Sequence, residues 1–296
     1  MTTESLATGD TSTTGAYPTV RRMRFPFGEP EPIRRHFVEG DIVMSHLVAV
    51  LSGAFPPGEE SFIRSVRRFS DQITDPVLKK RVAGFIGQES VHGQEHRKLN
   101  AHLADLGYPL VRFLLFSPTS VRQKLMLRIE KLFPAKVHLA MTAAAEHYTA
   151  VLGARVLSKD EIQAIPGDPE VWHLLNWHAM EELEHKSVAF DVYRAVGGSE
   201  RIRIAVMWFM YYLTIPFVTA AVSVSMLMDP TAWRPVKVLR QTYHIFRGPL
   251  LRGFMPEIRE YLRPGFHPDD VRTGELLERW QRELFGADGE LVGYVK

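Results

Sequence analysis

The sequence predicts an all-α protein, and three features of its 296 residues indicate this class. From about Gly40 onward, apolar residues recur three and four positions apart, as they do on one face of a helix. Asp75-Pro76 and Asp168-Pro169 each place a capping carboxylate before a proline, which suits the first position of a helix. Alternation of apolar and polar residues between turn residues, the pattern of a strand, is almost absent.

Breaks in the apolar pattern separate the expected helices. The Phe-Pro-Pro-Gly segment at 55–58 is expected to end a first helix, so that a second begins near Glu59. Gly107-Tyr-Pro109 and Gly197-Gly198 should end two later helices. The expected helices cover about residues 40–54, 59–73, 76–106, 118–132, 134–157 and 169–196, with further amphipathic helices after residue 228.

The composition excludes several classes of protein. Hydrophobic residues make up 45% of the chain, enough for a sizeable core. The 36 basic and 34 acidic residues leave a net charge of +2, which gives no support to nucleic-acid binding. Without cysteine, the chain has no disulfide, thiolate metal site or cysteine nucleophile. A bound metal must therefore be held by His, Asp or Glu, which suits iron, manganese or zinc.

The chain is expected to have three parts. Residues 1–30 should form a disordered N-terminal tail, because the first 20 are rich in Thr, Ser and Gly. Residues 31–200 should form a helical bundle that carries the candidate metal ligands. Residues 201–296 should form an apolar region and C-terminal helices packed on the bundle. Since the first residues lack the basic start and apolar middle of a secretory signal, a cytoplasmic location is expected.

Residues 204–228 contain no charged side chain, and this run is long enough to span a bilayer. One interpretation is membrane contact, which would make the protein membrane-associated. The other is a helix pair broken at Pro216 that lines an apolar pocket opening toward the candidate site. The proline and the scattered hydroxyl groups of the run favour the pocket.

Two segments carry Glu-x-x-His: Glu89-Ser-Val-His92 and Glu182-Leu-Glu-His185. In ferritin-like four-helix bundles, two helices each supply this motif and two others supply one Glu each, and together they hold two metal ions. One such motif is a weak signal, because Glu is common on helices. Two motifs on two apolar segments are a stronger signal, and they predict a ferritin-like four-helix bundle with additional C-terminal helices.

Helical spacing adds further candidates beside the two motifs. Residues three, four and seven apart share a helix face. His96 therefore lies on the face of His92, and His178 lies on the face of Glu182. Both histidines could ligate a metal, support a ligand, or act as catalytic acids or bases. Glu181 flanks the second stripe, so the sequence leaves open whether Glu181 or Glu182 is the ligand.

Two more carboxylates complete the expected set. Glu59 follows the Pro-Pro-Gly segment, and Glu146 follows three alanines that would leave room for a metal cluster. Four carboxylates would offset the charge of two divalent ions, whereas burying them without a metal would be costly. The candidate metal ligands are Glu59, Glu89, His92, His96, Glu146, His178, Glu181, Glu182 and His185.

Other titratable residues in these segments are expected to be structural. Glu95 and Glu184 should lie on solvated faces, because they point away from the candidate stripes. His147 is turned about 100° from Glu146 on a helix and should support the site from outside. Single histidines, including His36 and His46, are expected to be hydrogen-bonded core residues.

Five segments in order, FPPGE, RRFSDQITDP, FIGQESVHGQEHRKLN, AAAEHYTA and WHAMEELEHKSVAFDVY, resemble a bacterial family of predicted metal-dependent hydrolases. The resemblance covers roughly residues 30–270. It implies a ferritin-like fold and a dinuclear metal centre. The motif glutamate after Pro-x-Gly matches Glu59, and the two longer motifs match Gln88 to His96 and Trp177 to Lys186. Glu60-Ser61 departs from the basic and aromatic residues usual in the family, without affecting a ligand position.

These observations lead to one expected function and two alternatives. The expected function is a non-haem di-iron oxygenase or oxidase that acts on a small apolar substrate, with two iron ions, or alternatively manganese or zinc. The first alternative is a metal-dependent hydrolase that uses a metal-activated water. The second is a metal-binding or membrane-associated protein without catalytic activity. Because an oxidase and a hydrolase share most ligands, the sequence does not separate them, and it leaves the oligomeric state open.

Overall fold

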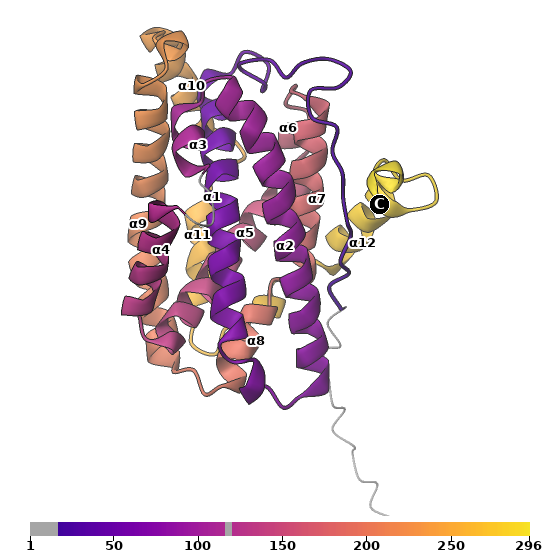
Figure 1. Cartoon of the computed structure of the whole chain (residues 1–296), viewed down its shortest axis with the longest axis vertical. Coiled ribbons are helices and arrows are strands. Elements are labelled where there is room, and N and C mark those ends of the chain that lie inside the picture. Colours follow the sequence, from indigo (N-terminus) through magenta and orange to yellow (C-terminus); the bar gives the residue numbers. More distant parts are fainter. Residues whose placement is uncertain (1–16, 116–119) are drawn as a thin grey trace, which may run out of the picture.

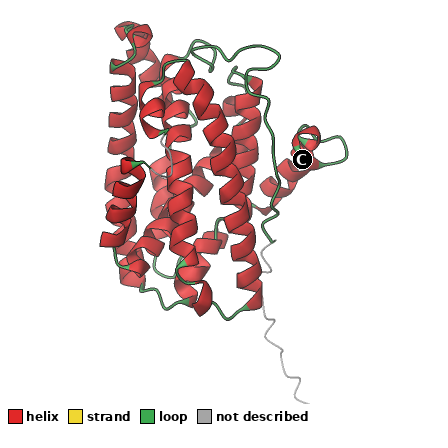
Figure 2. Ribbon diagram, in the orientation of Figure 1, coloured by secondary structure: helices red, strands yellow, loops and turns green. Residues whose placement is uncertain are grey.

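The computed structural model describes residues 17–115 and 120–296, and it confirms the all-α prediction (Figures 1 and 2). Within these ranges, β pairing is limited to two isolated bridges, Met23 with Val295 and Val38 with Gly167. The α-helices are α1 (Ile42–Arg67), α2 (Pro76–Asp105), α3 (Pro109–Leu114), α4 (Val121–Leu132), α5 (Ala135–Ser158), α6 (Asp160–Gln163), α7 (Pro169–His185), α8 (Val188–Ala195), α9 (Glu200–Leu227), α10 (Pro235–Arg247), α11 (Phe254–Arg259) and α12 (Gly274–Phe285).

Four helices, α1, α2, α5 and α7, meet at the centre of the molecule. Helix α1 packs against α2 and α5, and α7 packs against α5 and α2. One apolar cluster includes Phe85 and Leu139, and a second includes Leu99 and Trp177. The polar stretch of α2 between Phe85 and Leu99 therefore lies between two apolar clusters, which exclude water from it.

The capping prediction holds for two of these helices. The carboxylate of Asp75 accepts hydrogen bonds from the first turn of α2, and that of Asp168 does the same for α7. Each cap satisfies backbone N–H groups that the helix leaves unpaired.

The expected break at 55–58 is wrong, because α1 runs through Pro56 and Pro57 without interruption. Pro56 has no N–H to donate to the carbonyl of Ser52, four residues earlier. The side chain of Asn100 on α2 supplies the missing donor, with Nδ2 2.8 Å from the Ser52 oxygen. This contact lets α1 continue, so that Glu59 lies in mid-helix.

Two other helix boundaries differ from the sequence prediction. The helix expected over 169–196 ends at His185 and resumes as α8 at Val188. The expected break at Pro216 does not occur either, because α9 is continuous from Glu200 to Leu227. Pro216 leaves the carbonyl of Tyr212 without its helical donor, and both residues are exposed on the outer side of α9.

The N-terminal segment is ordered where the structure describes it. The prediction of a disordered tail over 1–30 is wrong for residues 17–30, while residues 1–16 lie outside the described range. Met23, Phe25 and Phe27 are buried, and Phe25 packs against Trp177 of α7. The segment crosses the molecule as an extended strap, seen as the long indigo loop in Figure 1. Its apolar residues explain its order, because they bury surface that a free tail would expose.

The part after residue 200 shares its core with the bundle. Phe254, Ile258 and Tyr261 belong to the same apolar cluster as Phe85 and Leu139. Helix α9 packs against α5 and α1, yet only four of its residues are buried. By length and composition it is the one helix of the described chain that could cross a membrane, and 6% of its most apolar stretch is buried.

Candidate metal centre

The nine candidate ligands lie close together in the interior. All are 0–4% exposed, and they come from four helices: Glu59 from α1; Glu89, His92 and His96 from α2; Glu146 from α5; and His178, Glu181, Glu182 and His185 from α7. Burial of so many ionisable groups in one place needs compensating charges, because each carboxylate loses its hydration.

The donor atoms form three overlapping groups, each with its atoms within 4.8 Å of one another. These groups are Glu59–His92–His178, Glu89–His92–Glu182 and Glu89–Glu146–His185. Nε2 of His185 lies 3.1 Å from Glu89 and 3.3 Å from Glu146. His92 and Glu89 each belong to two groups, so the three groups form one continuous set of donors.

Several polar atoms of this set are unpaired. Among the described residues, eight buried donor atoms of the cluster have no hydrogen-bond partner: both carboxylate oxygens of Glu59, Glu89 and Glu146, Nδ1 of His92 and Nε2 of His185. Buried polar atoms are rarely left unpaired in native proteins, since each costs about 1–3 kcal/mol. A His/Glu donor set of this kind suits Fe²⁺, Mn²⁺ or Zn²⁺. The residues present therefore fit divalent metal ions.

The carboxylates of the cluster repel one another, and their pKa values show this repulsion. Burial, with the nearby charges of Glu89 and Glu182, raises the pKa of Glu59 well above its usual range. Burial and the same two carboxylates also raise the pKa of Glu146. Burial lowers the pKa of His92, which keeps this imidazole neutral and able to ligate. Divalent ions would relieve the repulsion among the carboxylates.

His185 and Glu182 have pKa shifts that favour their charged forms. Burial opposes the charge of His185, but the carboxylate of Glu182, with help from Glu146, raises its pKa well above the usual range. Burial likewise opposes the charge of Glu182, but His185 and then His178 lower its pKa well below the usual range. A bound cation would replace the positive charge that His185 offers to these carboxylates.

Glu181 and Glu182, between which the sequence does not choose, have different places in the structure. Glu182 belongs to a donor group, whereas the carboxylate of Glu181 lies 2.9 Å from Nε2 of His92, on the far side of that ring. Burial raises the pKa of Glu181 to about 8, although Arg21 opposes this. A carboxylate behind a ligating imidazole typically orients it, so Glu181 has the place of a supporting residue.

His96 and His178 also differ in their contacts. Nε2 of His178 lies 2.9 Å from Glu182 and 3.8 Å from Glu59, inside a donor group. His96 belongs to none of the three groups, and its Nε2 contacts Nδ1 of His178 at 2.7 Å. The other ring nitrogen of His96 is 2.9 Å from the hydroxyl of Ser52. His96 therefore contacts the histidine at the cluster and not the carboxylates.

The expectation that Glu95 and Glu184 are solvated is wrong, because both are buried. The strap covers Glu184, whose carboxylate pairs with Arg21 at 2.7 Å. Gln88 connects this pair to the cluster: it donates to Glu184 at 2.6 Å, and its oxygen is 2.9 Å from Nδ1 of His185. The helical pattern gave no sign of Arg21, which lies in the segment expected to be a tail.

Ser52 and Asn100 are supporting residues that sequence reasoning missed. The hydroxyl of Ser52 donates to Asn100 at 2.7 Å and contacts His96. Asn100 lies four residues after His96, on the stripe that began with Glu89, so its spacing was a usable signal. His147 is buried but lies in none of the donor groups, and it packs against Tyr261 and Phe266.

An apolar cavity of about 100 Å³ reaches the cluster. Leu47, Val48 and Leu51 of α1 line one side, and His178 and Glu182 line its inner end. The other lining residues come from α1, α5, α6, α7, the loop before α7 and Leu250. No residue of the 204–228 run is among the described lining residues, so the prediction that this run lines the pocket is wrong. The run instead exposes a continuous apolar surface.

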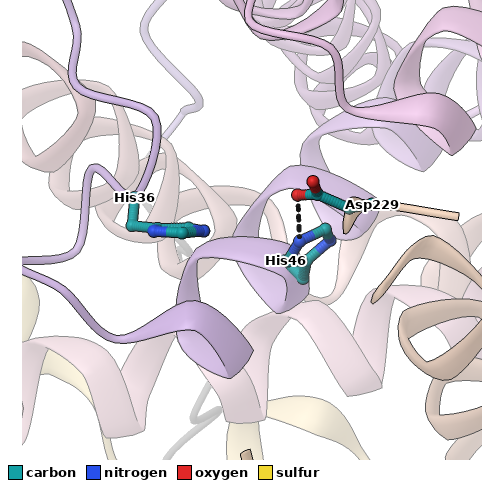
Figure 3. A group of neighbouring side chains, drawn as sticks. All are labelled: His36, His46 and Asp229. Carbon is teal, nitrogen blue, oxygen red and sulfur yellow. Dashed lines mark hydrogen bonds and ion pairs between the residues drawn. The ribbon is translucent and has the colours of Figure 1, made fainter. Parts of the chain in front are cut away.

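A separate group of metal-type side chains, His36, His46 and Asp229, lies where α1 meets the end of α9 (Figure 3). Nε2 of His46 is 3.1 Å from Asp229, and its Nδ1 is 2.9 Å from Ser225. Arg35 pairs with the same carboxylate at 2.6 Å. Burial lowers the pKa of His46 to about 4, so its imidazole is neutral. Since protein partners already satisfy His46 and Asp229, this group connects α1 to the turn after α9.

These features define an all-α protein with a buried histidine–carboxylate cluster that can hold metal ions. The family model for predicted metal-dependent hydrolases matches residues 19–272, and the chain belongs to this family. No curated protein and no solved structure matches the chain. Membership supports a metal-dependent enzyme, whereas the ferritin-like architecture stays a prediction. The di-iron oxygenase expected from the sequence receives no support from the family, which favours the hydrolase alternative.

Proposed function

We propose that the chain is a dinuclear metal-dependent hydrolase that cleaves an ester or related bond attached to an apolar chain. The observation that carries this proposal is the set of overlapping donor groups, with eight buried donor atoms left unpaired. The six residues proposed as ligands are Glu59, Glu89, His92, Glu146, Glu182 and His185. The family description supports hydrolysis as the reaction.

When bound, two divalent ions would polarise the bond to be cleaved and lower the pKa of a water molecule. The protein would supply orientation and proton handling. Glu181 fixes the ring of His92, and Gln88 fixes the ring of His185. These contacts hold both imidazoles in one orientation before substrate arrives, which is what ligand-supporting residues typically do.

His178 is the side chain best placed to hold a proton near the substrate. It lines the inner end of the cavity, and His96 contacts its other nitrogen. From His96, hydrogen bonds continue to Ser52 and Asn100. This chain of groups could move a proton away from the cavity as the bond breaks, so we propose His178 as the acid–base residue and His96 as its positioning residue.

The cavity supports an apolar substrate. Among its described lining residues, only Thr149, His178 and Glu182 carry side-chain oxygen or imidazole groups, and all three lie beside the donor cluster. The hydroxyl of Thr149 donates to Glu182. A substrate would thus bury an apolar chain between α1 and α5 and meet ionisable groups only at its reacting end.

Metal-dependent hydrolysis of nitrophenyl esters with short and long acyl chains tests the proposal. Protein stripped by a chelator should be inactive, and Mn²⁺, Fe²⁺ or Zn²⁺ should restore activity. Glu89→Gln should lose metal and activity, whereas Glu95→Gln, a buried change on the same helix, should keep both. Val48→Phe should raise KM for long-chain esters more than for short ones. A protein that holds two ions per chain but hydrolyses none of the esters would count against this substrate class.

A second candidate, an oxygenase acting on an apolar substrate, is favoured by the cavity itself. Its apolar lining gives a hydrolytic water few polar groups to bind, whereas an apolar chain and O₂ would enter readily. Oxygen uptake by the reduced, iron-loaded protein separates the two candidates. Uptake coupled to oxidation of a long-chain compound would favour the oxygenase, and ester cleavage without oxygen uptake would favour the hydrolase.

A further inference from the structure

Helix α9 presents an apolar face to the outside along its whole length. One side of the helix packs on α5 and α1, and the opposite side exposes a stripe at helical spacing: Phe209, Tyr212, Leu213, Phe217, Val224 and Leu227. Phe217 is 75% exposed and Leu227 is 71% exposed. Helix α9 forms an outer edge of the molecule, parallel to its long axis (Figure 1). Exposed apolar surfaces of this extent usually mark an interaction site.

Charge is distributed unevenly around this stripe. From Ile204 to Met255 the sole acidic residue is Asp229, which is buried and paired with Arg35. The same stretch carries five bases after the stripe, and they form no ion pair among the described residues: Arg234, Lys237, Arg240, Arg247 and Arg252. The surface is therefore apolar at its centre and positively charged beyond the end of α9.

Helix α4 extends the same surface on the other side of α9. A groove of about 720 Å³ lies between the two helices, lined by Met126 and Ile129 of α4, by Phe217 and Val224 of α9, and by residues of α1, α3 and α5. Nearly all of its lining is apolar. Helix α4 also exposes four bases, Arg122, Lys124, Arg128 and Lys131, while its one acid, Glu130, pairs with Arg64. An apolar groove beside bases that form no ion pair within the described ranges suits a molecule with an acyl chain and an anionic head.

We infer that the exposed face of α9, with α4 beside it, docks on the surface of an anionic lipid bilayer, and that α9 lies in the plane of that surface. Apolar side chains would enter the boundary of the acyl chains, and the bases would meet the headgroups. Trp233 and Tyr243, both exposed near the bases, are residues typical of a membrane interface.

Two alternatives fit the observations less well. In a spanning arrangement α9 would have lipid on every side, but Arg203 and Ser225 are buried against the rest of the molecule. A symmetric contact between two copies would place the same face against itself. The four bases of α4 would then meet those of the partner, and like charges oppose association. A helix lying on an anionic bilayer can keep its buried side against the protein, and its neighbouring bases meet negative charge.

Vesicle co-sedimentation of the full chain tests the inference without depending on the enzyme reaction. Vesicles of phosphatidylcholine alone should bind weakly, and vesicles that also contain phosphatidylglycerol should bind at least about tenfold more tightly, with loss at high salt. Leu213→Glu/Phe217→Glu should weaken binding at least about tenfold. The matched control is Val77→Glu, at an exposed apolar position on α2.

A second pair of variants tests the charge. Lys124→Glu/Arg128→Glu should abolish the preference for phosphatidylglycerol, whereas Lys79→Glu/Lys159→Glu, with the same change of net charge, should keep it. Absence of wild-type binding to both vesicle types would overturn the inference. A concentration-dependent dimer in analytical ultracentrifugation that Leu213→Glu/Phe217→Glu dissolves, without vesicle binding, would also overturn it and assign the face to a second copy. If the protein stayed in the membrane fraction after washing with high salt and alkali, the in-plane arrangement would be wrong.

Discussion

Replacing Glu146 by Gln should change stability in opposite directions with and without metal. Both oxygens of Glu146 are buried without a hydrogen-bond partner among the described residues. Burial and two nearby carboxylates raise its pKa above the ordinary value of 4.5. A carboxyl whose pKa is raised by folding destabilises the folded state at every pH above its unfolded pKa, because the folded state must hold a proton or bury a charge. Glutamine has nearly the same shape and avoids this cost.

The size of the effect has an upper limit. At pH 7 the cost cannot exceed about 3 kcal/mol, which is the free energy of protonating a carboxyl with an unfolded pKa of 4.5. The metal-free Glu146→Gln protein should therefore be more stable than the wild type by up to about 3 kcal/mol at pH 7, and the difference should vanish below about pH 4.5. With metal, the variant loses a ligand, and each tenfold loss of affinity lowers stability by about 1.4 kcal/mol under saturating metal.

Urea unfolding of chelator-treated and Mn²⁺-loaded protein measures both effects. The matched control is Glu184→Gln, a buried carboxylate of α7 whose pKa is lowered despite burial, because Arg21 pairs with it. This control should destabilise the protein whether or not metal is present. If Glu146→Gln destabilised the metal-free protein as much as Glu184→Gln does, or bound metal as tightly as the wild type, the proposed role of Glu146 would be wrong.

Three further changes have distinct expected outcomes. Burial lowers the pKa of His46 to about 4, so the neutral His46 contributes stability above its unfolded pKa of 6.5, and this contribution is lost as pH falls toward 4. The wild type should therefore lose stability between pH 7 and pH 5. In urea unfolding of the metal-free protein, His46→Gln should make this loss smaller by roughly 2 kcal/mol. Gly93→Ala would place a Cβ 3.0 Å from a carboxylate oxygen of Glu59. The Gly93→Ala variant should bind metal roughly tenfold more weakly in titrations, because a displaced ligand or supporting residue typically costs that much affinity. An unchanged affinity would argue against Glu59 as a ligand. Arg21→Met should lower the unfolding free energy by about 3 kcal/mol or more, because it leaves buried carboxylates unpaired; a loss below about 1 kcal/mol, as for a surface pair, would refute the buried pairing.

The sequence predicted the helices well where capping and spacing are local properties. Asp75 and Asp168 cap their helices as expected, because an N-cap depends on a few neighbouring residues. The continuation of α1 through Pro56 could not be predicted, since it depends on a donor from Asn100, 44 residues later. Long-range contacts of this kind have no local pattern.

The candidate site shows the same division. Spacing placed Glu89 and His92 on one face of α2, and they share a donor group in the structure, because residues on one helix face stay neighbours in any packing. Spacing could not decide between Glu181 and Glu182, since that depends on the rotation of α7 against α2. Arg21 could not be found from helical periodicity, because it lies in an extended strap.

The number and position of bound metal ions test the central claim most directly. Elemental analysis of protein purified with Fe²⁺, Mn²⁺ or Zn²⁺, followed by anomalous scattering from crystals at the metal edge, gives both. The account predicts two ions per chain, about 4 Å apart, between Glu59, Glu89, Glu146 and His185. A single ion at His36, His46 and Asp229, or a protein saturated with metal that shows no ion among the four central helices, would contradict it.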